Sequence, residues 1–265
     1  ACAMTLALAA GAIALPAAPA HAADPITAAD QSYFAYYHLD QARAKGYTGK
    51  GVTIALIDGE VDTSAPELAG ATIIDKSPCT VHSSTQSKSH ATALASLLVS
   101  SAYGVAPDAT LLTYRTRFED EGEDAAAGCA VRNGNGIEEN NSLINRAISD
   151  GAQIISISSS DKDFDEATKW TIARANARGV IVVTAMGNTA KDETDTGLAK
   201  WSGVVGVGAI DTTGNVAPYS SSGQGTTTAA VGGPIIVRNY ETGNKATTDG
   251  TSYSTPLIAG FLALA

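Results

Sequence analysis

The stretch GTSYSTPLIAG (250–260) raises the first chemical question in this chain. It places Ser252 between glycines and immediately before an apolar run. A serine hydroxyl is a weak nucleophile at neutral pH and needs a base beside it. The stretch therefore has two interpretations, an ordinary helix N-cap or a nucleophile held at the start of a helix.

Of the four histidines, His90 is the best candidate for that base. It is followed by the small residues of HATALASLL, which allow other backbone segments to approach it closely. We expect His90 to open a helix over 89–101, so a plain capping role is the alternative. The other three are less suitable: His21 lies in an apolar leader, His38 in an N-terminal segment, and His82 in a polar loop.

Asp58 is the best candidate for the partner that holds the imidazole. It ends the apolar run GVTIALID (51–58) and is followed by Gly59. A carboxylate at the carboxyl end of a parallel strand points into the expected cleft. A turn-initiating Asx residue is the alternative for Asp58, and Asp62 is a nearby competitor for the role.

Acyl transfer also needs donors for the oxyanion that develops on the carbonyl. The run VVTAMGN ends in Gly187-Asn188, so the Asn188 side chain is one candidate donor and the Ser252 N–H is the second. A plain Gly-Asn turn is the alternative. Each assignment is weak alone, but together they supply acid, base, nucleophile and oxyanion donor.

Apolar runs that alternate with helical patterns must position these residues. Strands without polar alternation are typical of a parallel sheet buried on both faces. The sequence therefore predicts an α/β, doubly wound, mostly parallel sheet with helices on both faces. The expected strands are 51–58, 109–115, 152–158, 179–185 and 201–210, and the expected helices are 89–101, 140–150 and 165–179.

The order of the three candidate residues, Asp58, His90 and Ser252, separates the chain from other hydrolases. An α/β-hydrolase runs Ser, Asp, His and carries G-x-S-x-G, and the chymotrypsin order is His, Asp, Ser. The chain instead resembles the subtilisin-like (S8) family of serine proteases. GVTIALID, SHATALASLL, VVTAMGN and GTSYSTPLIAG resemble its Asp strand, His helix, oxyanion strand and nucleophile signature.

The resemblance implies roles for these and further residues. It makes Asp58, His90 and Ser252 the catalytic residues, with Ser252 and not Ser254 as the nucleophile, and Asn188 the oxyanion residue. It also implies that ISISSS (155–160) is an edge strand that pairs with substrate backbone. Within that run, Ser158, Ser159 and Ser160 would form part of the S1 wall.

One departure from the family concerns the catalytic aspartate. The family usually has Asp-Ser-Gly or Asp-Thr-Gly, whereas this chain has Asp58-Gly59-Glu60. We expect the negative charge of Glu60 to raise the pKa of His90. This change and Ser89 before His90 leave a second reading open, a catalytically impaired subtilisin-like fold that acts as a binding or scaffold module. An esterase on the same triad is a third.

The N-terminal part has the pattern of an export signal. Residues 1–22 combine an apolar stretch, Pro16 and the small-residue site Ala20-His21-Ala22. We expect a signal peptide over 1–22 that is truncated at its start, a short extension over 23–46, and a peptidase domain from 47 to 265 that is truncated at its C-terminus. The short extension is similar to that of mycosins, an actinobacterial branch that ends in a membrane anchor.

Composition and cysteines bound the partners and the compartment. The formal net charge of −10 argues against nucleic acid as a partner. We expect a secreted or cell-surface protein that acts on protein or peptide substrates, with membrane anchoring only through a further C-terminal segment. Cys79 and Cys129 are an even pair once the leader is removed, so we expect a disulfide. No cofactor or metal is expected; structural calcium is frequent in the family, but no ligand spacing here is diagnostic.

Overall fold

The computed structural model of the protein describes residues 24–78, 83–116, 140–158, 166–192 and 197–265. Within these residues the chain builds a seven-stranded sheet in the order β2-β3-β1-β4-β5-β6-β7, in which every neighbouring pair is parallel. The expected mostly parallel sheet is therefore confirmed. A separate antiparallel pair is formed by β8 and β9.

The strands and helices have the following bounds. The strands are β1 (Thr53–Asp58), β2 (Thr72–Asp75), β3 (Thr110–Arg115), β4 (Ile154–Ile157), β5 (Ile181–Ala185), β6 (Val204–Ile210), β7 (Thr226–Val231), β8 (Ile235–Arg238) and β9 (Lys245–Thr248). The α-helices are α1 (Ser32–Tyr36), α2 (Leu39–Ala44), α3 (Thr85–Val99), α4 (Asn140–Ser149), α5 (Glu166–Ala177) and α6 (Thr251–Leu262). Short 3-10 turns cover Ala28–Asp30, Pro66–Leu68 and Leu198–Lys200.

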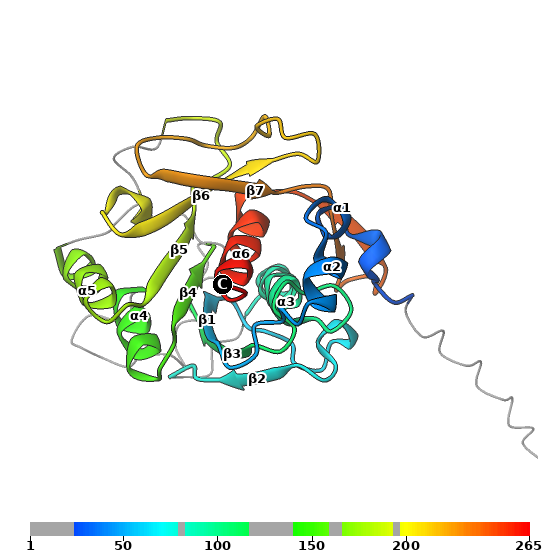
Figure 1. The fold of residues 1–265 in the computed structure, drawn as a ribbon, viewed down its shortest axis with the longest axis horizontal. Coiled ribbons are helices and arrows are strands. Elements are labelled where there is room, and N and C mark those ends of the chain that lie inside the picture. Colours follow the sequence, from blue (N-terminus) through cyan, green and yellow to red (C-terminus); the bar gives the residue numbers. More distant parts are fainter. Residues whose placement is uncertain (1–23, 79–82, 117–139, 159–165, 193–196) are drawn as a thin grey trace, which may run out of the picture.

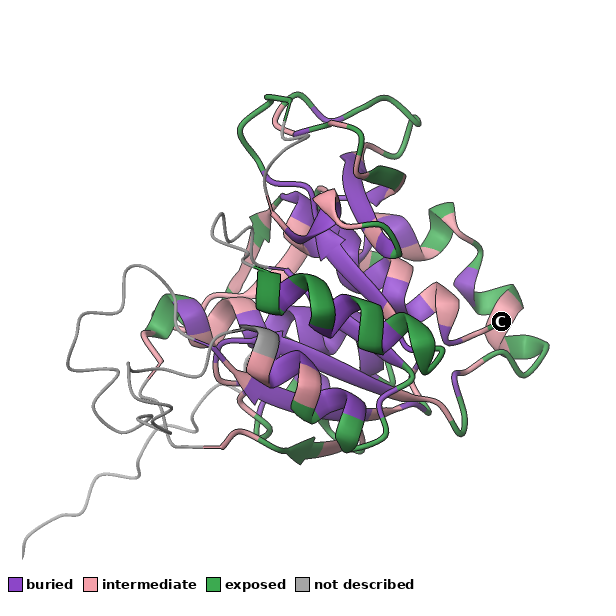
Figure 2. Ribbon diagram, turned by 90° about the vertical axis from the view of Figure 1, so that its left-hand side faces the viewer, coloured by how far each residue is buried: buried purple, intermediate pink, exposed green. Residues whose placement is uncertain are grey.

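Both faces of the sheet are covered by helices, as the unbroken apolar runs predicted. In β1, Ile54 and Leu56 belong to the core shared with α3 and α6, whereas Ala55 and Ile57 belong to the core shared with α4 and α5. Figure 1 shows α4 and α5 on one side of the strands and α3 and α6 on the other. The strands at the centre are buried (Figure 2).

The helix that carries His90 begins earlier than the sequence predicted. The expected helix starts at 89, but α3 starts at Thr85, so His90 lies in its second turn and does not open the helix. The cause is Ser84, whose hydroxyl accepts the backbone N–H of Ser87 at 3.1 Å and caps the helix. The capping alternative for His90 is therefore wrong.

The sequence did not predict β2, β7, the β8–β9 pair or the N-terminal helices. The segment 24–46 packs against the domain. The buried Tyr33 donates from its hydroxyl to the carbonyl of Tyr103 at 2.9 Å. The side-chain amide of Gln31 donates to the backbone of β8 at Ile236 O (2.8 Å) and accepts from Ile236 N (3.2 Å). In the part of the chain that the structure describes, no helix has both the length and the apolar content to cross a bilayer.

The topology brings the ends of distant segments together. β1 lies between β3 and β4, so the chain builds one side of the sheet through β3 and β2 and then returns to build the other side from β4. Open parallel sheets place their sites outside the carboxyl ends of strands at such a switch point. The carboxyl ends of β1 and β4 are Asp58 and Ile157, and Ser158 follows directly.

Candidate active site

Asp58 and His90 form a hydrogen-bonded pair between the end of β1 and helix α3. The Nδ1 N–H of His90 donates to Oδ1 of Asp58 at 2.9 Å. The same Oδ1 accepts the backbone N–H of Gly59 at 2.9 Å. The Asp58 side chain is fully buried, whereas that of His90 is 21% exposed. A buried carboxylate therefore holds one imidazole nitrogen, while the ring itself stays partly exposed.

The pKa of His90 is raised above its ordinary value of 6.5. Burial of the ring acts most strongly and in the opposite direction, because it disfavours the imidazolium. The charge of Asp58 and its hydrogen bond outweigh burial. The pair is therefore built to stabilise a protonated imidazole, which is the form that a general base acquires during catalysis.

The pKa of His90 is raised, as expected, but the causes that account for the rise are the charge and hydrogen bond of Asp58, and a contribution from Glu60 stays a prediction. The carboxylate of Glu60 lies 3.3 Å from Nζ of Lys88 and 3.4 Å from the Arg115 guanidinium. Glu60 is thus paired with two cations, and the attraction named for the raised His90 pKa comes from Asp58. The departure from the family's Asp-Ser-Gly pattern thus adds a local ion-pair cluster beside the acid–base pair.

Ser252 lies in the first turn of α6, one residue after the helix begins. Gly250 is the N-cap, with φ at 150°, so Ser252 is not a cap. Its hydroxyl donates to the backbone carbonyl of Ser158 at 3.1 Å. Ser254, the other serine of the motif, is fully buried and donates to the Ala230 carbonyl at 2.9 Å. Of the two, only Ser252 is partly accessible.

The start of α6 also lies against His90. The rings of His90 and Tyr253 meet edge to face with their centroids 5.7 Å apart. Tyr253 follows Ser252 directly, so the structure brings the imidazole to the turn that carries the hydroxyl. For His90 to take the Ser252 proton, this hydroxyl must turn away from the Ser158 carbonyl.

Asn188 is oriented by the first residue of α6. Its side-chain Oδ1 accepts the backbone N–H of Thr251 at 2.8 Å and the Thr251 hydroxyl at 3.0 Å. Oδ1 therefore satisfies one N–H of the helix N-terminus, a role that Gly250 cannot fill. The amide NH2 of Asn188 consequently points away from Thr251. A Cβ built on Gly250 would lie 3.3 Å from the Nδ2 atom of this group.

The interpretation of 155–160 as an edge strand is wrong for its first part. Residues 154–157 form β4, which is paired with β1 on one side and with β5 on the other. The backbone groups of β4 are therefore used inside the sheet, and an added strand could pair only beyond Ile157. Ser158 stands at that point, and its hydroxyl donates to the Ser252 carbonyl at 2.9 Å.

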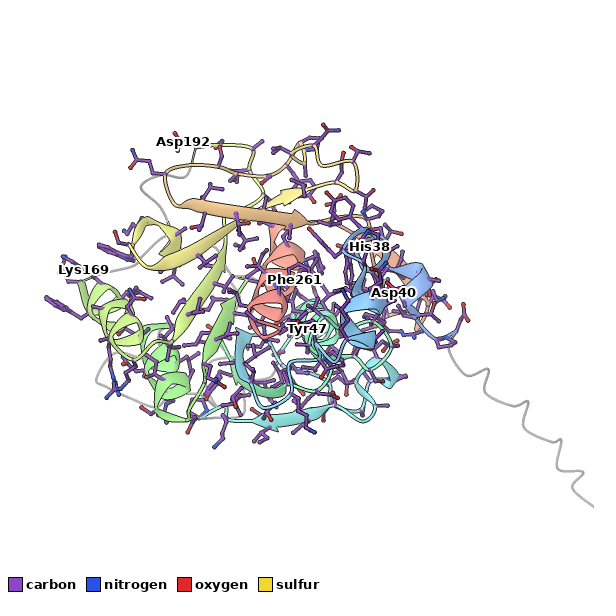
Figure 3. All side chains as sticks on the ribbon, viewed as in Figure 1. His38, Asp40, Tyr47, Lys169, Asp192 and Phe261 are labelled. Carbon is purple, nitrogen blue, oxygen red and sulfur yellow. The ribbon has the colours of Figure 1, made fainter. Side chains whose placement is uncertain are left out.

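Several other predicted residues lie away from the pair or outside the described chain. Asp62 accepts the N–H and hydroxyl of Ser64 in a local turn, so it is no competitor for His90. His38 is exposed among the N-terminal helices, beside Asp40 (Figure 3). The predicted residues His21, His82, Cys79, Cys129, Ser159 and Ser160 lie outside the described residues.

Comparison with known proteins places this geometry in a family. A model of the subtilase family matches residues 49–265. Thermostable alkaline protease of Halalkalibacterium halodurans is 30% identical over 235 residues, covering 86% of this chain and 60% of that protein. Subtilisin E of Bacillus subtilis is 28% identical over 244 residues, with the same two coverages.

The chain belongs to the subtilase family.

A solved structure of the protease domain of PatA has the same fold as this subtilase. It is 25% identical, has a TM-score of 0.67, and the match covers 80% of this chain and 78% of that one. The chain spans about 60% of the length of the first curated relatives it matches. These relatives are not mycosins, and the mycosin-like branch stays a prediction.

Sequence reasoning assigned no role to Thr251, although it stands inside the Gly-Thr-Ser motif of this subtilase. The residue is fully buried, and besides its contacts to Asn188 its hydroxyl accepts the Gly187 N–H at 3.1 Å. Thr251 thus ties the loop that carries Asn188 to α6, the helix that carries Ser252. The sequence signal for this role was the position of a polar residue, Thr251, between Gly250 and Ser252 in the motif.

A cavity of about 510 Å³ lies beside the start of α6. Tyr219, Thr248 and Asp249 are among its lining residues, and Tyr219 Oη accepts the Gly250 N–H at 3.2 Å. Asp58, His90, Asn188 and Ser252 are not among the residues that line it, so this cavity is separate from the candidate site. Among the described residues, no three His, Cys, Asp or Glu side chains gather as a metal site.

Proposed function

We propose that this subtilase is an exported serine endopeptidase that hydrolyses peptide bonds through Asp58, His90 and Ser252. The observation that carries the proposal is the 2.9 Å bond from His90 Nδ1 to a fully buried Asp58, with the His90 ring against Tyr253 at the nucleophile turn. Base and orienting acid are thereby held at the turn that presents the only partly accessible serine of the motif.

The reaction starts when Nε2 of His90 takes the Ser252 proton as Oγ attacks the scissile carbonyl carbon. Asp58 keeps Nδ1 protonated and stabilises the imidazolium that forms. The imidazolium then protonates the leaving amine as the C–N bond breaks, which leaves an acyl group on Ser252. Water, deprotonated by the same imidazole, hydrolyses this ester and restores the hydroxyl.

The oxyanion of the tetrahedral intermediate is held by Nδ2 of Asn188 and the backbone N–H of Ser252. The Asn188 oxygen is already bound to Thr251, so its amine is set in advance for this role. The Ser252 N–H belongs to the first turn of α6, where helix N–H groups lack intrahelical partners and the dipole favours negative charge. Preorganised donors of this kind are usually the largest electrostatic contribution to acyl transfer.

The substrate class and the compartment are proposed from the family and from the leader pattern. Protein or peptide substrates are proposed from family membership, and Ser158 marks where substrate backbone can align beyond β4. Export is proposed from the leader pattern over 1–22. The reaction uses groups of the chain alone, so we propose no cofactor, and structural calcium stays a prediction without assigned ligands.

Labelling of the full-length protein with a fluorophosphonate, which reacts only with an activated serine, tests the proposal. We expect one adduct, mapped by mass to Ser252, that is lost in Ser252→Ala and His90→Ala and retained in the matched variant Ser254→Ala. A folded protein without an adduct would instead support the binding-module reading. An adduct combined with cleavage of ester but not peptide substrates would support the esterase.

A further inference from the structure

Two buried polar atoms beside the acid–base pair have no hydrogen-bond partner among the described residues. They are Oδ2 of Asp58 and Oγ of Ser87. Asp58 is 0% exposed and Ser87 is 2% exposed. One atom is a charged acceptor and the other is a hydroxyl donor. Buried polar groups are rarely left unpaired, so each requires an explanation.

Gly59 connects the two atoms. A Cβ built on this glycine would lie 2.2 Å from Oγ of Ser87 and 2.8 Å from its carbonyl oxygen. The N–H of the same glycine donates to Oδ1 of Asp58. Ser87 is therefore packed against the residue that already binds one oxygen of the carboxylate. The close approach of α3 leaves no room for a side chain at 59, so a hydroxyl at this place has to come from α3.

We propose that Ser87 is a positioning residue for the acid–base pair. Its hydroxyl donates to Oδ2 of Asp58, directly or through one water molecule, while Oδ1 holds His90 and the Gly59 N–H. The carboxylate is then fixed on both oxygens. The inference rests on the proposed function and adds a residue that acts only through Asp58.

The charged and titratable groups around Asp58 determine how the Ser87 hydroxyl affects the pKa of His90. His90 and Tyr253 face the site from α3 and α6, and the Glu60 ion pairs with Lys88 and Arg115 lie beyond Gly59. A hydrogen bond to Oδ2 withdraws negative charge from the carboxylate. Removal of the donor leaves more charge facing His90 and stabilises its imidazolium.

Ser100 provides a matched control in the same helix. It is the C-cap residue of α3, is 0% exposed, and its Oγ is also buried without a partner. Ser100→Ala and Ser87→Ala therefore remove the same group from equally buried places. Only the second change touches the acid–base pair.

The first test compares thermal unfolding of both variants in a Ser252→Ala background, which is inactive by design. Removal of an unpaired hydroxyl is neutral or stabilising, so Ser100→Ala should leave Tm unchanged or raise it. Ser87→Ala should lower Tm because it leaves the buried carboxylate oxygen without its donor. Equal shifts in Tm for the two variants would overturn the proposal.

The second test follows the His90 ring by NMR titration in the same inactive background. Ser87→Ala should raise the His90 pKa, and Ser100→Ala should leave it unchanged. A His90 pKa that is the same in both would also overturn the positioning role. Neither readout needs turnover, so an inactive parent protein would contradict the proposed function and still leave the role of Ser87 decided.

Discussion

The two halves of the candidate site differ in how their buried polar groups are paired. In the nucleophile half, Asn188 Oδ1 accepts two bonds from Thr251, the Thr251 hydroxyl accepts from Gly187, and Ser254 donates to a core carbonyl. In the acid–base half, Asp58 Oδ2 has no partner among the described residues.

This difference in pairing parallels how closely each half matches the family's sequence motifs. The nucleophile half matches the family's motif closely, whereas the acid–base half carries the departure Asp58-Gly59-Glu60 and a new ion-pair cluster. A buried group without a partner costs about 1–3 kcal/mol. Oδ2 of Asp58 carries this cost unless a donor reaches it, and Ser87 is the donor proposed above.

The largest effect should come from the acid–base half. Asp58→Asn should lower kcat about 10⁴-fold, because an amide favours the wrong tautomer of His90 and cannot stabilise its cation. Steady-state kinetics on a peptide substrate measures this loss. Asp62→Asn is the matched control, since that carboxylate binds Ser64 in a local turn and faces Tyr240. Losses of similar size in both variants would show that the orienting acid has been misassigned.

A smaller loss is expected in the nucleophile half. Asn188→Ala should lower kcat about 10²- to 10³-fold with little change in KM, because the donor acts on the transition state. Asn188→Asp keeps an oxygen that accepts the Thr251 N–H but lacks the amide NH2 donor. It should therefore lose turnover to a similar degree while the N-terminus of α6 keeps its acceptor. Normal turnover in Asn188→Asp would mean that the amine does not serve the oxyanion.

Thr251→Val tests how much the hydrogen bonds of the Thr251 hydroxyl contribute to turnover. The change removes one bond to Asn188 and the acceptor for Gly187 N–H, at a typical cost of about 1 kcal/mol per bond. If the whole cost of about 2 kcal/mol falls on the transition state, kcat should drop about 30-fold, since 1.4 kcal/mol corresponds to a factor of ten. Thr251→Ser keeps the hydroxyl and should retain most activity. Equal losses in Val and Ser would point to packing instead.

The smallest effect concerns pH. Because the folded pKa of His90 is raised, the base is neutral only above this value, so the acid limb of kcat/KM should lie above pH 6.5. The same shift stabilises the folded state below the unfolded pKa, and this contribution is lost as pH rises through the folded value. In Ser252→Ala protein, the difference in unfolding free energy from His90→Gln should shrink across that window. An acid limb below pH 6.5 would contradict the shift.

The sequence by itself determined the sheet type and most of the central elements. Unbroken apolar runs such as GVTIALID can be buried on both faces only in a parallel sheet covered by helices, and five of the strands follow from such runs. The strands β2, β7, β8 and β9 carry exposed or half-buried positions, so they gave no comparable signal. The start of α3 was missed because its cap, Ser84, stands in a run of polar residues.

The candidate residues could likewise be chosen from sequence motifs, but the distances and contacts between them could not be predicted. Asp58 and His90 are 32 residues apart, and only the packing of α3 on the end of β1 brings their atoms to 2.9 Å. Tertiary structure alone decided that Lys88 and Arg115 pair with Glu60, that β4 is internal, and that Ser87 lies against Gly59. The reason is physical: a local pattern sets which face of an element is buried, whereas charge pairing and close approach depend on which distant segments that burial brings together.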